Sequence, residues 1–414
     1  MAQPLPLATT ATSPASVPAE VRALDRRRVR IESVDIVRGV IMILMALDHT
    51  RDYFGDAAAS PTNLATASAA LFMTRWITHL CAPVFFLLTG TGASLARRRR
   101  STSELSRFLF TRGLWLIFLE LVVYRCLILQ FNFDYQVTVL TVLWALGWAM
   151  IVLSALVYLP VKVVAAIGTV IIVLHNLLDS VNAQALGSFA PVWTVLHGPG
   201  VVFTDGHHML FAAYPLVPWV GVTAVGYGLG ELYRWDGARR RAFLLRAGVV
   251  LTAAFVVLRA VNVYGDPSRW AVQSTPLFTL LSFVNTTKYP PSLLFLLMTL
   301  GPALLFLRAV DERTPAWLQP ALIIGKVPMF YFLLHFLLIH ILTVFGALLR
   351  YGDAHWMFES PTLDHFPITQ PPGWPLPLPA VWLIWISVPV MLYPLCRWFA
   401  GVRQRRTDWW LSYL

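Results

Sequence analysis

Two apolar stretches between residues 34 and 96 carry more ionisable side chains than a membrane span ordinarily holds. They read VDIVRGVIMILMALDHTRDYF and LFMTRWITHLCAPVFFLLTGTGASLA. Each is long enough to cross a bilayer, because about 20 apolar residues cover a hydrocarbon core roughly 30 Å thick. Together they contain Asp35, Arg38, Asp48, His49, Arg51, Arg75 and His79. A charged group at membrane depth costs roughly 3 kcal/mol and faces a bundle interior or a watery cavity, so we predict that these residues form a functional site.

The composition indicates the same class of protein. Of 414 residues, 57% are hydrophobic and only 13% are charged, and the mean hydropathy is +0.65. Soluble domains are about 45–50% apolar and about 25% charged, so this chain lacks the polar surface of a soluble enzyme. We predict an all-α, polytopic helix bundle in the cell membrane.

The pattern of apolar runs predicts about ten membrane spans. They are expected at residues 34–52, 71–95, 109–130, 137–158, 161–178, 211–231, 243–263, 291–309, 321–349 and 379–399. With the N-terminus in the cytoplasm, most arginines and lysines fall on cytoplasmic segments, as the positive-inside rule requires, and the C-terminus is cytoplasmic too. We therefore expect a disordered basic tail over 1–30, a transmembrane domain over 31–402 and a short cytoplasmic tail over 403–414.

Several other kinds of site are not indicated. Cys81, Cys126 and Cys396 lie in apolar stretches without metal-ligand or disulfide spacing, so no metal site is predicted. The net charge of +11 comes from short arginine clusters rather than one basic face, which argues against nucleic acid. Arg97–Arg100 are expected to contact anionic lipid headgroups.

Helical geometry places Arg38 and His49 on one side of the first span. They are eleven residues apart, which on an α-helix means about 20° of rotation and about 16 Å of rise. Met42 and Met45 lie between them on that side. Asp35 with Arg38, and Asp48 with Arg51, have the i,i+3 spacing of local ion pairs.

The other candidate residues lie on later spans. Arg75 and His79 share one helix face by their i,i+4 spacing, and Glu120 is a candidate counter-ion for a buried arginine such as Arg38. Lys326 lies near the expected cytoplasmic face. His335 and His340, five residues apart, point about 140° away from each other, so we expect at least one of them to serve packing.

The longer outer connections are rich in proline, glycine, histidine and tryptophan. They comprise residues 179–210, 264–290 and 350–378. Such segments either cap the bundle and line an opening, or are ordinary surface loops.

A histidine near the outside and a guanidinium near the cytoplasm fit acyl transfer. A neutral imidazole accepts a proton from an attacking hydroxyl or amine, or carries an acyl group itself, and an aspartate beside it orients the ring. A guanidinium binds phosphate through two hydrogen bonds, so a cytosolic acyl-CoA suits Arg38, Lys326 or the arginine clusters.

The same residues carry a family resemblance. The run RIESVDIVRGVIMILMALDHTRDYF, followed by TRWITHLCAPVFFLLTGTGASLARRRR, resembles the opening of the heparan-alpha-glucosaminide N-acetyltransferase catalytic-domain family, within the wider transmembrane acyltransferase group. KYPPSLLFLLMTLGPALL and GKVPMFYFLLHFLLIH are similar to bacterial relatives, so the resemblance extends from about residue 30 to 400. It implies an enzyme that transfers an acetyl or other acyl group from cytosolic acetyl-CoA or another acyl-CoA to an extracytoplasmic sugar amine or hydroxyl.

One departure from the family concerns the catalytic histidine. In the lysosomal enzyme it is proposed to lie in the loop after the first helix, but residues 52–70 here contain no histidine. The wider group places a histidine after its Arg-Gly motif, which corresponds to His49. We therefore predict His49 as catalytic, supported by Asp48, with His79 as the second candidate. Arg38, Arg51, Arg75, Glu120 and Lys326 are the predicted substrate or donor contacts.

Two alternatives to an acyltransferase stay open. A transporter or exporter would use the buried charges to bind substrate or relay protons, whereas a structural partner in an envelope-assembly complex leaves those charges unexplained. Membrane lipids are expected partners in each case, and CoA-dependence separates the enzyme from the other two.

Overall fold

The computed structural model describes residues 31–56, 59–311, 314–406 and 408–412, and these residues are mostly helical. The predicted tail over 1–30, and residue 407 and residues 413–414 of the predicted C-terminal tail, lie outside the described residues. The helices are α2 (Glu32–Phe54), α3 (Ala69–Thr78), α4 (Cys81–Ala96), α5 (Thr102–Phe118), α6 (Val142–Leu156), α7 (Val161–Leu174), α8 (Ala190–Leu196), α9 (Leu216–Leu229), α10 (Gly237–Val261), α11 (Pro276–Val284), α12 (Leu293–Ala309), α13 (Gln319–Lys326), α14 (Pro328–Tyr351) and α15 (Leu378–Arg405).

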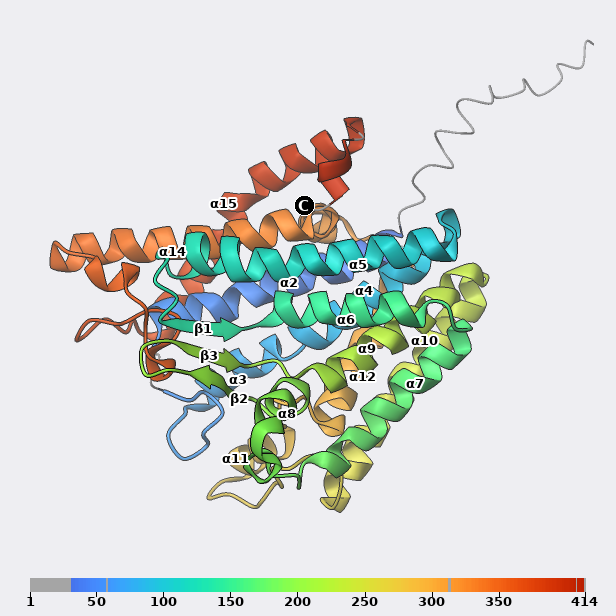
Figure 1. The fold of residues 1–414 in the computed structure, drawn as a ribbon, viewed down its shortest axis with the longest axis horizontal. Helices are drawn as coiled ribbons and strands as arrows, with labels where there is room; N and C mark the ends of the chain where they lie inside the picture. The colour runs from blue at the N-terminus through green and yellow to red at the C-terminus, as the bar shows by residue number, and fades with distance from the viewer. Residues whose placement is uncertain (1–30, 57–58, 312–313, 407, 413–414) are drawn as a thin grey trace, which may run out of the picture.

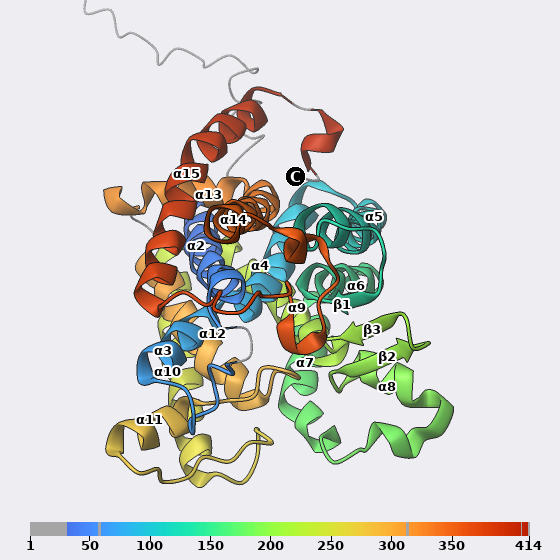
Figure 2. The ribbon, with the colours of Figure 1, turned by 90° about the vertical axis from the view of Figure 1, so that its left-hand side faces the viewer.

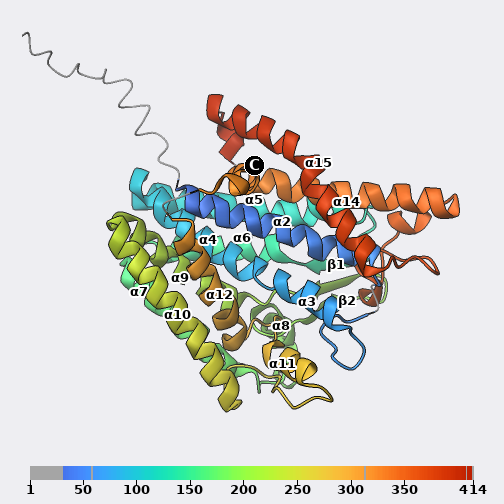
Figure 3. The same cartoon turned by 180° about the vertical axis from the view of Figure 1, so that it is seen from behind.

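The long helices form a bundle (Figure 1), which Figure 2 shows end-on, with α2, α14, α5 and α6 side by side. Helix α2 packs against α13, α14 and α15, and α4 packs against α9. In Figure 3, α15 crosses α14 obliquely, and α10 lies with α12 on another side of the molecule. The first span of the sequence is thus surrounded by helices from both ends of the chain.

Each predicted span contains a helix, but these helices differ in length and hydropathy. Within the described residues, five helical segments are long and apolar enough to cross a membrane: Ala69–Arg99, Val161–Leu178, Gly237–Val261, Pro328–Tyr351 and Leu378–Arg405. Helices α6 and α12 are apolar but shorter. The number of ten crossings and the cytoplasmic placement of both termini stay predictions.

A small sheet corrects the all-α prediction. Strand β3 (Met209–Ala212) pairs in parallel with β1 (Val137–Leu140) and antiparallel with β2 (Gly200–Thr204). β1 falls in the span predicted over 137–158, and β3 overlaps the first two residues of the span predicted over 211–231, so the helices α6 and α9 begin later than expected. The sheet lies at the end of the bundle where α2 finishes (Figure 1).

Two predicted continuous spans are interrupted. The span at 71–95 is divided into α3 and α4 by His79 and Leu80, although both residues keep right-handed helical φ and ψ. The span at 321–349 divides at Val327, whose φ of −133° and ψ of 52° are non-helical, and Pro328 starts the next helix. Proline has no N–H and suits the first turn of a helix, which is why α14 begins there.

Two glycines bring α2 and α13 into backbone contact. A Cβ added at Gly39 would overlap the carbonyl of Ala321, and one added at Gly325 would overlap the carbonyl of Asp35. Small residues permit this close approach between membrane helices. The glycine of the Arg-Gly motif therefore fixes Arg38 against α13.

The third span ends in a π-helix. Helix α5 continues without a break into residues Leu119–Leu129, which have π geometry. This widened turn brings the buried Glu120 and Tyr124 inward. π segments occur frequently at functional sites, and this one contributes to a cavity described below.

Candidate active site

Two cavities and a surface hollow follow one side of α2. We call them the arginine hollow, the apolar cavity and the histidine cavity. Arg38 lines the hollow and the apolar cavity, Met42 lines the apolar cavity, Met45 lines both cavities, and His49 lines the histidine cavity. This agrees with the helical spacing, which places these residues on one side of the span.

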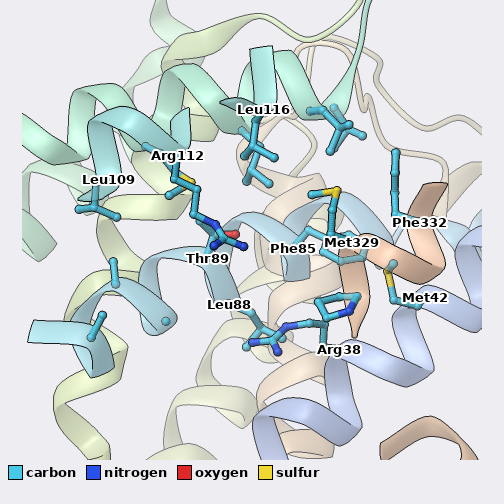
Figure 4. Close-up of a pocket in the computed structure, with 18 of the residues that line it drawn as sticks. Arg38, Met42, Phe85, Leu88, Thr89, Leu109, Arg112, Leu116, Met329 and Phe332 are labelled. Atoms are coloured by element: carbon cyan, nitrogen blue, oxygen red, sulfur yellow. The ribbon is translucent and has the colours of Figure 1, made fainter. Parts of the chain in front are cut away.

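The apolar cavity lies among α2, α4, α5, α6 and α14 and has a volume of about 300 Å³. Its wall is mainly aliphatic, aromatic and methionine side chains, with Arg38, Arg112, Lys326 and Arg403 among the polar exceptions. Figure 4 shows Arg38 and Arg112 reaching it from different helices, with Met329 and Phe332 on another side. A long apolar chain with a charged end matches this lining.

The arginine hollow continues from the apolar cavity. It has a volume of about 450 Å³ and shares Arg38, Gly92, Ala96 and Arg403 with that cavity. Arg98, Arg99 and Arg100 complete its basic wall. Arg100 also lies over the ring of Phe108, at 4.2 Å from the centroid, and Phe108 itself lines the apolar cavity.

Arg38 is held at the junction of these two spaces. Its Nη1 donates to Oδ1 of Asp35 at 2.8 Å, as the sequence spacing predicts, and to the carbonyl of Gly325 at 3.2 Å. The predicted pairing of Arg38 with Glu120 is wrong. Glu120 instead accepts hydrogen bonds from the backbone N–H groups of Thr141, Leu143 and Trp144 at the start of α6. A carboxylate at a helix N-terminus satisfies N–H groups that have no partner within the helix.

The histidine cavity lies at the other end of α2 and has a volume of about 510 Å³. Its charged lining consists of Asp48, Arg51, Asp52, Arg75 and Lys288. Strands β1 and β3 and the loops around Pro199 and Phe366 form much of the remaining wall. The connections predicted to lie outside the membrane thus contribute residues to the wall of a cavity, as one of the two sequence interpretations expects.

The two cavities adjoin at three shared residues, Met45, Phe85 and Val142. We call this junction the neck. It joins the middle of α2 to α4 and to the first residue of α6. The hollow, the apolar cavity, the neck and the histidine cavity therefore form one series of spaces along α2.

His49 lies between a carboxylate and an aromatic wall. Its Nδ1 is 3.7 Å from Oδ2 of Asp52, and its ring centroid is 3.8 Å from that of Phe336 and 5.5 Å from that of His335. Its side chain is 21% exposed to solvent. With Nδ1 turned toward Asp52, Nε2 remains for a substrate.

Asp48 forms its ion pairs and hydrogen bonds with residues other than His49, in contrast to the predicted supporting role. Its Oδ1 is 2.7 Å from Nη1 of Arg51 and accepts a hydrogen bond from the hydroxyl of Thr78 at 3.1 Å. Its Oδ2 forms a short ion pair with Arg75 on α3. Adjacent helical residues point about 100° apart, so Asp48 links helices while Asp52, one turn beyond, faces His49.

His79, the second predicted catalytic residue, lies outside the lining of the histidine cavity. His79 is buried between α3 and α4, with its ring centroid 5.3 Å from that of Phe295, and it does not line the histidine cavity. Arg75, four residues earlier, does line the cavity. The two residues therefore differ in their access to that space.

The histidines of α14 have different surroundings, as their spacing predicts. His335 has its Nδ1 3.0 Å from the carbonyl of Tyr331 and lies beside His49. His340 bridges the carbonyls of Ile128 and Met357, at 3.0 Å and 2.9 Å, and stacks on Phe131. His340 therefore joins distant segments and is a packing residue.

Several cavity residues were missed by the sequence reasoning. Asp52 is the last residue of the first predicted span and was not among the predicted site residues, although its i,i+3 spacing from His49 can be read from the sequence. Tyr289 and Tyr214 face one another, with hydroxyl oxygens 3.4 Å apart, and Lys288 lies 5.0 Å from the ring centroid of Tyr289. Burial raises the pKa of the Tyr289 phenol, but the charges of Lys288 and Arg75 outweigh burial and hold that pKa below its ordinary value.

Comparison with known proteins gives one family. The model of the family described as "Heparan-alpha-glucosaminide N-acetyltransferase, catalytic" matches residues 30–265, more than half of the chain. No curated protein matches the chain. The matched range contains α2, α4, α5 and α6, which supply the three neck residues and most of the wall of the apolar cavity, and it also contains most of the residues that line the histidine cavity.

Proposed function

The chain belongs to the heparan-alpha-glucosaminide N-acetyltransferase catalytic-domain family, and on that premise we propose that it is a membrane acyltransferase. It transfers an acetyl or other acyl group from cytosolic acyl-CoA to an amine or hydroxyl of a saccharide on the outer side of the cell membrane. The observation that carries this proposal is the series of spaces along α2, which begins at arginines and ends at His49.

The donor end of this proposal rests on the arginine hollow. Guanidinium groups bind phosphates through paired, charge-assisted hydrogen bonds. In the proposed complex, Arg38, Arg403 and the 98–100 cluster hold the phosphates of CoA, and the apolar cavity receives its thin pantetheine arm. The acyl thioester then reaches the neck, since about 16 Å of helix rise separates Arg38 from His49.

The chemical step is assigned to His49. Nε2 of His49 accepts the proton of the acceptor amine or hydroxyl as its nitrogen or oxygen attacks the thioester carbonyl carbon. The C–S bond then breaks, and the thiolate takes that proton from the His49 imidazolium to leave as CoA-SH, which returns His49 to its neutral form. Asp52 orients the imidazole through Nδ1 and stabilises the imidazolium that forms. The 3.7 Å separation is typical of a catalytic pair that tightens when substrate binds.

A two-step version uses the same residues. Nε2 attacks the thioester first, CoA-SH leaves, and an acceptor that enters the histidine cavity removes the acyl group from the imidazole. In this version donor and acceptor need not be bound together. The two versions are distinguished by incubating the protein with the donor in the absence of acceptor. Only the two-step version yields a chain whose mass is increased by one acyl group.

The test is CoA-dependent transfer by the purified full-length chain. Acetyl-CoA is supplied to the protein in detergent with glucosamine as a probe acceptor, and both free thiol and N-acetylglucosamine are measured. We expect equal release of the two products, and loss of both in the His49→Ala variant. Movement of a saccharide across proteoliposomes without any acyl transfer would instead favour the transporter alternative.

A further inference from the structure

A second group of chemistry-bearing side chains lies outside the series of spaces along α2. His175 begins a 3-10 turn (His175–Leu178) directly after α7, Asp179 caps that turn, and His197 caps α8. One ligand atom from each of these residues lies within 4.8 Å of the others, and Nε2 of His197 is 3.4 Å from Oδ1 of Asp179. Two segments separated by a long connection therefore bring two imidazoles and a carboxylate together.

Both imidazoles are buried without ordinary partners. His175 and His197 are each 3% exposed, and within the described part of the chain none of their four ring nitrogens makes a hydrogen bond of ordinary geometry. A buried polar atom without a partner costs about 1–3 kcal/mol, and folded proteins seldom leave several together. In each neutral imidazole one nitrogen is an N–H donor and the other has a free lone pair, so each ring needs a group that accepts that lone pair.

A divalent metal ion meets this need. Imidazole nitrogen and carboxylate oxygen are ligands of zinc and related ions, and a tetrahedral ion with bonds of about 2.1 Å holds its ligand atoms about 3.4 Å apart. The His197–Asp179 pair already has this spacing. We propose that His175, Asp179 and His197 bind one divalent transition-metal ion of the zinc class, with a fourth position left for water.

The surroundings resemble the outer shell of a metal site. Nδ2 of Asn176 donates to Oδ2 of Asp179 at 2.8 Å, leaving Oδ1 for the ion. The carbonyl of Pro291 lies beside the His175 ring, where it can accept the proton of the nitrogen that does not bind metal. Such partners fix the orientation of ligating side chains. Asp179 is more exposed than either histidine, which gives an ion access from solvent.

The ion would join two parts of the wall of the histidine cavity. Pro199 lines that cavity two residues after His197, and Lys288 and Tyr289 line it just before Pro291. Oδ1 of Asn176 also accepts the backbone N–H of Leu293 at 2.8 Å. The metal therefore has a structural role in this proposal: it holds the end of α8 against the end of α7, where Asn176 also binds the start of α12.

Metal content provides the direct test. The full-length chain is produced with added zinc, its affinity tag is removed, and metal per chain is measured by mass spectrometry after dialysis. We expect about one equivalent in the wild type and nearly none in His175→Ala or His197→Ala. His208→Ala is the matched control, because His208 also pairs with an aspartate, Asp205 at 3.0 Å, but is exposed; it should keep its metal.

Reconstitution makes the test independent of variant folding. Wild-type protein stripped with a chelator is titrated with Zn²⁺, and we expect a single site and a raised melting temperature. Co²⁺ in the same site should show the visible absorption of a four-coordinate ion. A wild type that purifies without metal and binds neither Zn²⁺ nor Co²⁺ stoichiometrically overturns the proposal, as does equal loss of metal in His208→Ala.

Discussion

Oδ2 of Asp52 lies 3.7 Å from Nδ1 of His49, one helical turn further along α2. Arg51 contacts the other oxygen of Asp52, with its Nη2 2.6 Å from Oδ1, and it also pairs with the carboxylate of Asp48, which in addition pairs with Arg75 on α3. The two carboxylates share Arg51 but differ in their second partner, which is the histidine for Asp52 and another helix for Asp48. The first three predictions depend on this division.

His49→Ala should lower acyl transfer by about 10²–10⁴-fold, because it removes the general base or acyl carrier. CoA affinity and the melting temperature in detergent should change little. His49→Asn and His49→Gln should be nearly as inactive as His49→Ala. An asparagine variant with near-normal turnover would exclude His49 from the chemistry and leave it a packing role.

Asp52→Asn should lower kcat at least tenfold without changing the KM for the acyl-CoA, because it removes the carboxylate that orients and stabilises the imidazole. Asp52→Glu should recover part of the rate. Steady-state kinetics with acetyl-CoA and glucosamine measure both effects. An unchanged kcat in Asp52→Asn would contradict the positioning role, whereas a lower melting temperature would reflect the ion pair of Asp52 with Arg51.

Asp48→Asn should act mainly on stability. Removing this carboxylate leaves the guanidinium of Arg75 buried without its ion pair, at a cost of about 3–5 kcal/mol. The double variant Asp48→Asn/Arg75→Gln should recover part of that loss, since the unpaired charge is gone. Thermal melts in detergent measure the stability of the two single variants and the double variant. Strictly additive losses of stability would show that Asp48 and Arg75 are not energetically coupled.

Arg38→Lys should weaken binding of CoA about tenfold or more, because a lysine cannot reproduce the two-pronged contact of a guanidinium with phosphate. Arg107→Lys is the matched control, because Arg107 is exposed on α5 and lines none of the three spaces. Calorimetric titration with CoA measures the difference. Unchanged CoA affinity in Arg38→Lys, with the fold intact, would rule out phosphate recognition by Arg38.

Val142→Phe should narrow the neck and reduce acyl transfer at least tenfold while CoA still binds. Val152→Phe places the same added volume on the exposed side of α6 and serves as control. The comparison needs only turnover and CoA affinity for each variant. Full activity in Val142→Phe would show that the acyl group does not pass between Met45, Phe85 and Val142.

The sequence was most informative where helical periodicity decides the outcome. The shared side of Arg38, Met42, Met45 and His49, and both i,i+3 ion pairs of α2, follow from spacing within one helix. Ten apolar runs each contain a helix for the same reason. These features depend on local geometry, which a single segment of sequence specifies.

Features that depend on distant contacts were not predictable in this way. The use of Glu120 as the cap of α6 requires the π-helix and the start of α6 to meet. The group of His175, Asp179 and His197 lacks recognisable ligand spacing because its members come from two segments. Strand β1 lies inside a predicted span and β3 at the beginning of another, where a short apolar strand resembles the start of a helix.

The neck has a further consequence for the membrane that contains it. A continuous watery passage between the two sides would let ions leak and discharge the gradients that the membrane stores. Thioether, phenyl and isopropyl groups surround the junction, and constrictions lined by such groups exclude water and ions. In the proposed orientation, the neck admits an uncharged acyl thioester while the bilayer remains electrically insulated.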